Sequence, residues 1–260
     1  MDSPSSFLSP NGRLAARIPG WEPRPQQIVM ADLVAAAIDQ KKHAIIEAGT
    51  GTGKSLAYLI PAVLAATADQ AFQEENQLEQ QQQTGHEDQK PEKANEKRPR
   101  RIVIATHTIA LQEQLVKKDI PVVSAVMPHE FSAVLVKGRG NYISLRRLAL
   151  AKEREGSLFQ YDEEVSELEG LLEWSGNTRD GSLADLPTIP RSSVWDEVHS
   201  DSGNCMGRAC PRYNECHYFA ARRRMNNAQV LVVNHALFFS DLALRRNGVS
   251  LLPEYDIVIL

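Results

Sequence analysis

The sequence has no long apolar run, few cysteines and no excess of basic charge. No stretch approaches the roughly 18 consecutive apolar residues of a membrane-spanning helix, and residues 1–20 lack the continuous apolar core of a signal peptide. Three cysteines in 260 residues do not resemble a secreted disulfide framework. The net charge of -4 provides no overall field that would attract nucleic acid or an acidic membrane. We therefore expect a soluble cytoplasmic protein that contacts no membrane and binds nucleic acid only through local patches.

Short apolar runs alternate with helical patterns along much of the chain, and 42% of the residues are hydrophobic, which is enough for a sizeable core. This alternation is typical of a parallel sheet with crossover helices, an α/β fold. Strands are expected at 43–47, 101–108, 132–138, 228–239 and 255–260, and helices at 24–40, 55–66 and 109–118.

Two segments interrupt the alternation. Residues 68–100 are mostly Gln, Glu, Lys and Pro and cannot bury enough apolar surface to offset the entropy of ordering, so we expect a disordered insertion. Residues 140–216 are charged, rich in loops and contain all the cysteines, so we expect an inserted module. The Ser/Pro/Gly-rich residues 1–20 are expected to form a flexible arm. The main α/β domain then consists of 21–139 and 217–260.

A glycine-rich loop lies between the first expected strand and the next helix. Such a loop binds phosphate because glycine backbone N–H groups turn inward and the helix N-terminus adds partial positive charge. Lys54 would reach the β- and γ-phosphates, and the Ser55 hydroxyl would bind Mg²⁺. Ala48 departs from the usual G-x4-G-K-S/T pattern by one methyl group, and a glycine-rich turn with a surface lysine is the plainer alternative. The loop consists of Ala48, Gly49, Thr50, Gly51, Thr52, Gly53, Lys54 and Ser55.

Several further motifs occur with this loop in a fixed order. They read RPQQIVM (24–30), EAGTGTGKS (47–55), ATHTIALQEQL (105–115), KGRGNY (137–142), CMGRACPRYNEC (205–216) and VVNHALFF (232–239). Over residues 21–260 the set resembles the DinG/XPD family of superfamily 2 DNA helicases, and it is closer to the bacterial DinG branch. The resemblance implies a RecA-like P-loop NTPase domain, the first of two motor domains, interrupted by a small cysteine-containing insertion. It also implies ATP-dependent 5′-to-3′ movement on single-stranded DNA or on DNA with single-stranded tails, in DNA repair.

The resemblance assigns roles to residues near the loop and at strand ends. Gln27 matches the glutamine that reads adenine, whose donor and acceptor edges an amide can pair with, and Arg24 of the same motif joins it in the nucleotide site. Residues 106–108 match a loop that touches the DNA backbone; an ordinary strand-end turn is the plainer alternative. Asn234 and His235 match a stretch near the nucleotide, and a capped turn explains them equally well locally.

The three cysteines, Cys205, Cys210 and Cys216, lie close together in the sequence, which suggests a soft metal site, either iron–sulfur or zinc. The resemblance implies a four-cysteine [4Fe–4S] cluster in this insertion, with its first cysteine just after the KGRGNY-type stretch. Ser144 stands at that position here. A serine is a harder and far less acidic ligand than a thiolate, so four thiolates are not available within the chain.

Three alternatives remain for the cysteines. A cluster could be bound by the cysteines together with Ser144, with His199 or His217, or with solvent. Zinc could be held by the cysteines and His217. The cysteines could also pack simply as small apolar side chains.

Arginines and tyrosines surround the cysteines in the sequence. The arginines would suit phosphate contacts despite the acidic total charge, and the tyrosines could stack on bases. A solvated arginine face and ordinary packing of the tyrosines are the plainer alternatives. The residues are Arg139, Arg146, Arg147, Arg212, Arg222, Arg223 and Arg224, with Tyr142, Tyr213 and Tyr218.

No Asp-Glu-x-His box follows YDIVIL (255–260) in this sequence. In the family that the chain resembles, this strand leads into such a box, whose Asp holds Mg²⁺ and whose Glu orients the attacking water. Glu254 and Asp256 do not replace them. We therefore expect part of a longer ATPase that binds nucleotide weakly and hydrolyses it poorly. A non-catalytic nucleotide- or nucleic-acid-binding module, or an inactive fragment, is the alternative.

Overall fold

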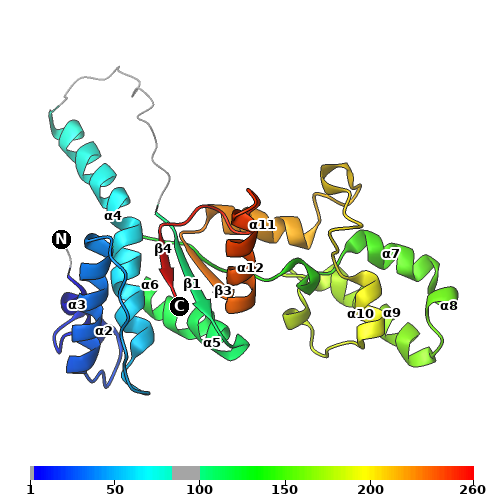
Figure 1. Cartoon of the computed structure of the whole chain (residues 1–260), viewed down its shortest axis with the longest axis horizontal. Helices are drawn as coiled ribbons and strands as arrows, with labels where there is room; N and C mark the ends of the chain where they lie inside the picture. The colour runs from blue at the N-terminus through cyan, green and yellow to red at the C-terminus, as the bar shows by residue number, and fades with distance from the viewer. Residues whose placement is uncertain (1–2, 84–99) are drawn as a thin grey trace. The chain divides into compact units, whose positions relative to one another are not determined.

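The computed structural model describes residues 3–83 and 100–260, which form two units (Figure 1). The first unit comprises Met1–Leu135 and Ala228–Leu260, and the second comprises Val136–Asn227. The module expected at 140–216 lies within the second unit, which also includes the helix that follows it. Among the described residues, no helix combines the length and the apolar character needed to cross a membrane.

A four-stranded sheet with the order β2-β3-β1-β4 is the centre of the first unit. All of its pairings are parallel, and Ile102 lies opposite both Val230 and Ile257. The central strands are runs of buried Val, Ile and Leu because the strands of a parallel sheet are covered on both faces. This sheet confirms the predicted α/β fold. The strands are β1 (Ile102–Thr106), β2 (Ala133–Leu135), β3 (Val230–Asn234) and β4 (Ile257–Ile259).

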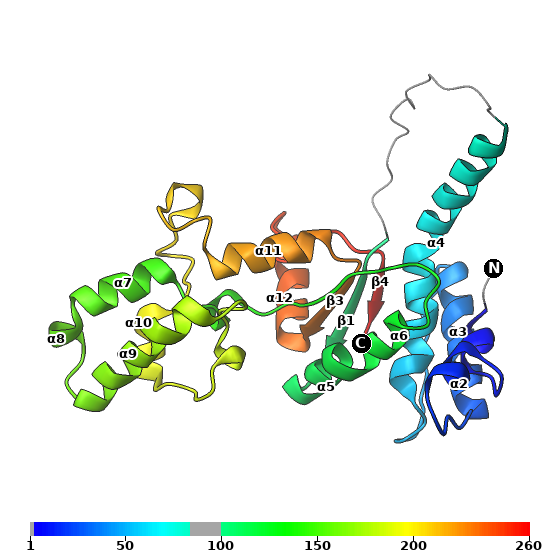
Figure 2. The same cartoon turned by 180° about the vertical axis from the view of Figure 1, so that it is seen from behind.

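Helices lie on both faces of this sheet (Figures 1 and 2). Side chains alternate along a strand, so Ile102 and Ile104 pack in one core with α4 and α6. Val103 and Ala105 are buried on the opposite face, where α12 contacts β1 and β3. The helices of this unit are α1 (Pro4–Leu8), α2 (Arg13–Arg17), α3 (Pro25–Asp39), α4 (Lys54–Gln83), α5 (Ile109–Gln114), α6 (Ile120–Ser124) and α12 (His235–Arg245).

The N-terminal residues are folded, and the prediction of a flexible arm at 1–20 is wrong for the described part. Residues 4–8 and 13–17 form α1 and α2, and the side chains of Phe7, Leu8 and Leu14 are completely buried. They belong to the same core as α4. Burial of three large apolar side chains gives several kcal/mol, roughly 1.5–3 for each, which offsets part of the entropy of ordering this short segment.

The strand expected at 43–47 is absent from the described part of the chain. These residues pair with no strand, and the Ile45 side chain is fully exposed. A strand requires a neighbour for its backbone N–H and C=O groups, and none of the four strands lies beside this segment. The strand expected at 228–239 is shorter than predicted, because α12 begins at His235.

Two helices extend beyond their predicted ends. Helix α4 continues to Gln83, so residues 68–83 are helical and not disordered as predicted; their Ala, Gln, Glu and Leu content favours the helix. The rest of that predicted insertion, 84–99, lies outside the described residues. The helix predicted at 109–118 also continues, through a π-helical turn (Leu115–Asp119) into α6. Pro121, which has no N–H to donate, lies just after the π-helical turn.

The second unit is helical and has its own core. Ile143, Leu148, Leu168, Val194 and Val198 are buried together in it. Its helices are α7 (Leu145–Glu153), α8 (Glu155–Leu158), α9 (Asp162–Asn177), α10 (Ser192–Val198) and α11 (His217–Asn227), with 3-10 turns at Arg139–Asn141, Leu183–Asp185 and Gly207–Ala209. The cysteines lie on the segment between α10 and α11, outside this core.

Candidate nucleotide-binding site

The glycine loop leads directly into α4, which begins at Lys54. Gly51 and Gly53 have φ angles of 80° and 79°, a left-handed conformation that glycine adopts without steric cost. The Thr52 hydroxyl donates to the Gly49 carbonyl at 2.9 Å and closes the loop on itself. Backbone N–H groups in such a turn at a helix N-terminus suit an anion. The helix and the turn expected for a phosphate loop are therefore present, although the strand expected before it is not.

Lys54 folds back over this loop. Its Nζ donates to the Ala48 carbonyl at 2.8 Å and to the Gly49 carbonyl at 3.3 Å. These carbonyl oxygens stand in for the phosphate oxygens that an ammonium group binds. Phosphate oxygens carry negative charge and attract an ammonium group more strongly than neutral carbonyl oxygens do. A phosphate in the loop would therefore draw the Lys54 ammonium away from the carbonyls.

The start of α3 is bonded to the glycine loop. The Arg24 guanidinium donates to the Gly51 carbonyl, and Gln27 Nε2 donates to the Gly53 carbonyl at 2.9 Å. Gln27 is 3% exposed. A Cβ atom at Gly53 would collide with the Gln27 amide, so only glycine allows this contact. The structure thus brings Arg24 and Gln27, more than twenty residues upstream, to the phosphate loop.

Tyr58 is a further residue of this site that sequence reasoning missed. Burial raises its pKa to about 12, against the opposing effect of a hydrogen bond with the Ser55 side chain. Tyr58 therefore remains a neutral phenol that holds the hydroxyl proposed to bind Mg²⁺. The spacing of Ser55 and Tyr58, three residues apart on one helix, is a signal that could have revealed this contact.

The strand-end residues with predicted DNA or coupling roles act as helix caps here. The Thr108 hydroxyl accepts from Leu111 N at 3.2 Å at the start of α5, and Asn234 Oδ1 accepts from Leu237 N at 2.7 Å at the start of α12. His235 Nε2 lies 3.2 Å from the Ala105 carbonyl oxygen. These contacts agree with the plainer alternative of capped turns. They also place both loops at the carboxyl edge of the sheet, where α/β proteins carry functional groups.

Ser144 and all three cysteines line one small pocket in the second unit, with a volume of ≈ 30 Å³. The Ser144 hydroxyl caps α7 by accepting from Arg147 N at 3.4 Å. Cys205 is exposed, and its Sγ accepts from Gly207 N at 3.4 Å. Burial raises the pKa of the Cys205 thiol, but hydrogen bonds from Arg139 and Gly207 outweigh it, and the net shift is downward.

The residues around this pocket do not fit a metal site as they are placed. Among the described residues, no three His, Cys, Asp or Glu side chains are arranged to hold a metal ion. Neither His199 nor His217 lines the pocket. His199 Nδ1 lies 3.0 Å from the Ser200 carbonyl, and the His217 ring is packed against Gly181. The arrangement thus places Ser144 in the same pocket as the three cysteines and provides no histidine there as a fourth ligand.

Most of the arginines predicted to face DNA have partners within the second unit. The Arg139 guanidinium lies 3.9 Å from the centre of the Tyr218 ring. Arg147 donates to the carbonyls of His199 and Asp196, at 2.7 Å each. Of the tyrosines, Tyr142 is buried, and burial raises its pKa to about 12. Arg146, Arg212 and Arg224 bond to Asn204, Glu215 and Asp180, and Tyr213 packs on Phe219.

Comparison with known proteins agrees with these features. The family model of the DEAD/DEAH box helicases matches residues 25–141, which include α3, the phosphate loop and β1. The chain is 34% identical to the ATP-dependent DNA helicase YoaA of Escherichia coli, over 97% of this chain and 34% of the relative. It is 30% identical to the ATP-dependent DNA helicase DinG of Photobacterium profundum, over 89% of this chain and 30% of the relative. It is also 30% identical to the ATP-dependent helicase DinG of Mycobacterium tuberculosis H37Rv, over 94% and 34%.

The chain thus spans about a third of the length of these relatives. Nearly all of its residues take part in the matches, including the second unit. The parallel α/β sheet and the glycine loop bonded to α3 are consistent with the family match. Residues 25–141 therefore match a DEAD/DEAH box helicase domain, and the chain is similar to YoaA and DinG over most of its length.

Proposed function

We propose that this chain is the ATP-binding part of an ATP-dependent DNA helicase. The observation that carries the proposal is the bonding of the phosphate loop to the start of α3, through Arg24 to Gly51 and Gln27 to Gly53. A loop suited to phosphate and an amide suited to adenine thereby meet at one place. That combination favours ATP over ligands that carry phosphate alone.

In the proposed complex each residue of the site has a separate task. Backbone N–H groups of 49–53 bind the phosphates, and Lys54 bonds the β- and γ-phosphates. Gln27 exchanges the Gly53 carbonyl for the adenine edge. The Ser55 hydroxyl, hydrogen-bonded with Tyr58, would hold Mg²⁺, which would neutralise negative charge on the phosphates.

For the whole protein we propose translocation on single-stranded DNA in the 5′-to-3′ direction, coupled to ATP hydrolysis, in the cytoplasm. The relatives named above support the DNA helicase activity by their names. Within this chain, His107 and Thr106 at the end of β1 are the candidates for backbone phosphate contact. His107 is exposed, and its ring lies 5.9 Å from that of His235 at the end of β3.

Binding without hydrolysis is the second candidate for the 260 residues by themselves. The carboxylates next to β4 are occupied: Asp256 accepts from Arg101 N at 2.8 Å, and Glu254 accepts from Arg245 at 2.8 Å. Both carboxylates thus bond to arginine residues of this unit, which gives them a structural role. We therefore expect this chain to bind ATP and to leave it intact.

The Lys54→Ala variant tests the proposed site. We expect the affinity for Mg²⁺–ATP to fall about 10- to 100-fold, because a charge-assisted bond to phosphate is lost. Calorimetric titration of the chain with ATP measures this, and GTP titrated in parallel tests the role of Gln27. Lys42→Ala is the control, because Lys42 is exposed on the same approach to the loop. Equal affinity in the two variants would contradict the site, and ATP turnover by the chain alone would contradict binding without hydrolysis.

A further inference from the structure

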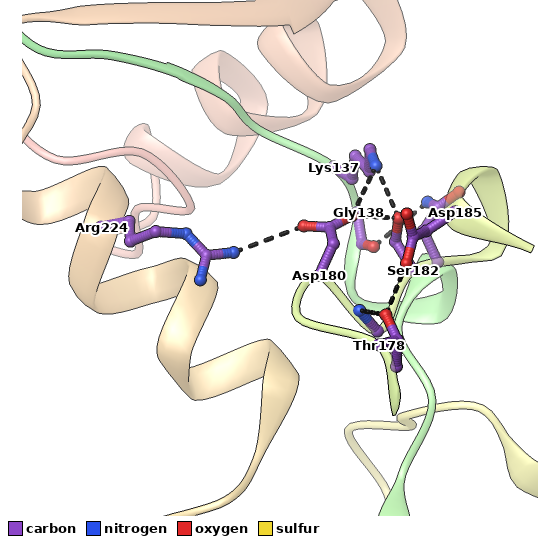
Figure 3. A network of polar contacts seen from close by, with 9 residues as sticks. Lys137, Gly138, Thr178, Asp180, Ser182, Asp185 and Arg224 are labelled. Atoms are coloured by element: carbon purple, nitrogen blue, oxygen red, sulfur yellow. Dashed lines mark hydrogen bonds and ion pairs between the residues drawn. The ribbon is translucent and has the colours of Figure 1, made fainter. Parts of the chain in front are cut away.

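Asp180 lies between two cations from opposite ends of the second unit (Figure 3). Lys137 comes directly after Val136, where the unit begins, and Arg224 is in the last turn of α11, where the unit ends. Lys137 Nζ is 2.9 Å from Asp180 Oδ2, and Arg224 Nη2 is 3.4 Å from Asp180 Oδ1. Each carboxylate oxygen of Asp180 therefore binds a cation from a different end of the unit.

The loop that carries Asp180 is held by its own hydrogen bonds (Figure 3). The Ser182 hydroxyl donates to Asp180 Oδ2 and accepts from Lys137 Nζ at 2.6 Å. The Thr178 hydroxyl accepts from Gly181 N at 2.8 Å and donates to Asp185 at 2.5 Å. Ser182 is completely buried, so these bonds face little competition from water. The hydrogen bond from Ser182 thus helps to hold the Asp180 carboxylate in position between the two cations.

The same loop also makes uncharged contacts with both ends of the unit. On one side, Ile143 N donates to the Gly181 carbonyl at 2.9 Å, and Tyr142 forms an isolated bridge with Ser182. On the other side, the ring of His217, the first residue of α11, packs so closely on Gly181 that a Cβ atom there would collide with it. Gly181 has a φ of 66°, which also favours glycine. The loop is therefore wedged between the two segments.

We propose that Asp180 fastens the start and the end of the second unit to each other. Lys137 and Arg224 are both cations and repel each other unless an anion lies between them. Asp180 is 43 residues from Lys137 and 44 from Arg224, and it adds an anionic link to the contacts that the two segments already make, the loop's neutral contacts and the stacking of Arg139 on the Tyr218 ring. The side chain of Lys137 is 19% exposed, and its ammonium would lose its only anionic partner among the described residues. This inference does not depend on ATP or DNA binding.

The Asp180→Asn variant of the whole chain tests the proposal by hydrogen exchange. An asparagine keeps the shape of the side chain and removes its charge. We expect backbone amides of both 139–143 and α11 to exchange roughly tenfold faster, while those of α9, in the core, are unchanged. The matched control is Asp185→Asn, which alters a carboxylate of the same loop that contacts neither cation. Faster exchange in only one of the two segments, or the same pattern in the control, would overturn the proposal.

A double-mutant comparison keeps the proposal testable if Asp180→Asn perturbs the fold. We expect Lys137→Met to speed amide exchange in 139–143 and Arg224→Met to speed it in α11. Each change should have less effect on the other segment. In the wild-type background the losses in the free energy of unfolding that the two substitutions cause should be non-additive, because both residues bind one carboxylate. Urea unfolding measures these losses. In the Asp180→Asn background they should be additive. Additivity in both backgrounds would show that Asp180 does not link the two segments.

Discussion

Gly53 is the residue at which the phosphate loop meets α3. Its φ of 79° belongs to the left-handed region, and the Gln27 amide occupies the space that a Cβ atom would need. Gly49, in the same loop, has open space around its Cα and no left-handed φ. Two glycines of one motif thus have different structural requirements, although the sequence pattern treats them alike.

Gly53→Ala should therefore weaken ATP binding more than Gly49→Ala does. We expect a loss of affinity of at least about tenfold for Gly53→Ala, since both the strained φ and the displaced Gln27 alter the loop. For Gly49→Ala we expect a change of less than about threefold. Isothermal titration of both variants with Mg²⁺–ATP provides the measurement. A similar loss in the two variants would show that Gln27 is not seated against Gly53 in solution.

Single residues could be predicted from the sequence where their partners are local or belong to a motif. The glycine loop, Lys54 and Ser55 follow from one short pattern, and Gln27 from a neighbouring motif. Asp180 and Lys137 are 43 residues apart in a segment without periodic pattern, so only the folded chain shows that they meet. Ser144 was predicted as a possible ligand, but its position directly before a helix also favours the cap that the structure shows.

At the scale of secondary-structure elements, a buried aspartate fixes the segment between α12 and β4. Asp241, on α12, is completely buried and accepts from Leu251 N at 2.6 Å and from Leu252 N at 2.8 Å. Arg245 Nε also donates to it at 2.6 Å, and the same guanidinium donates to the carbonyls of Leu252 and Pro253. The chain is thereby turned back onto α12 before it enters β4.

Asp241→Asn should destabilise the first unit by about 2–4 kcal/mol. The amide would place its N–H donors against either the backbone N–H groups of Leu251 and Leu252 or the Arg245 guanidinium, and it would remove the negative charge buried beside Arg245. Urea unfolding followed by circular dichroism measures the loss. Asp32→Asn is a suitable control because Asp32 is exposed on α3, and we expect a change below about 0.5 kcal/mol. Equal free energies of unfolding for the two variants would mean that the Asp241 hydrogen bonds make no net contribution to stability.

Elements with a strong local period were predicted well, and those made by tertiary contacts were not. The sequence predicted α3, β1 and β3 because their apolar spacing or continuous apolar runs are visible locally. Helices α1 and α2 are too short to show a period, and they owe their order to burial of Phe7, Leu8 and Leu14. The strand expected at 43–47 failed for the opposite reason, because a suitable apolar run has no neighbouring strand among the described residues.

At the scale of the whole molecule, the two units have separate cores and only the first contains the phosphate loop. A ligand stabilises the state that binds it, by about 2.7 kcal/mol at 100 times its Kd. Mg²⁺–ATP should therefore slow hydrogen exchange in β1 and α4 far more than in α9. Mass spectrometry of exchanged peptides measures this protection, and equal protection of α9 by ATP would contradict the expectation.

Leu59→Ala and Leu168→Ala, one in each core, should each lower the free energy of unfolding by about 2–5 kcal/mol. Mass spectrometry of exchanged peptides locates each loss of stability in its own unit.

The π-helical turn at Leu115–Asp119 shifts the phase of the helix that contains it. An α-helix advances about 100° per residue, so side chains five apart point in clearly different directions. Leu115 and Ile120 are five apart, yet both are buried in one core, because the wider turn absorbs an additional residue. Helices α5 and α6 are thus continuous, but the buried face of α6 is rotated about the helix axis relative to that of α5. A helical period counted straight through from 109 to 124 would assign the second half to the wrong face, and any insertion or deletion within the turn would reset which side of α6 meets the sheet.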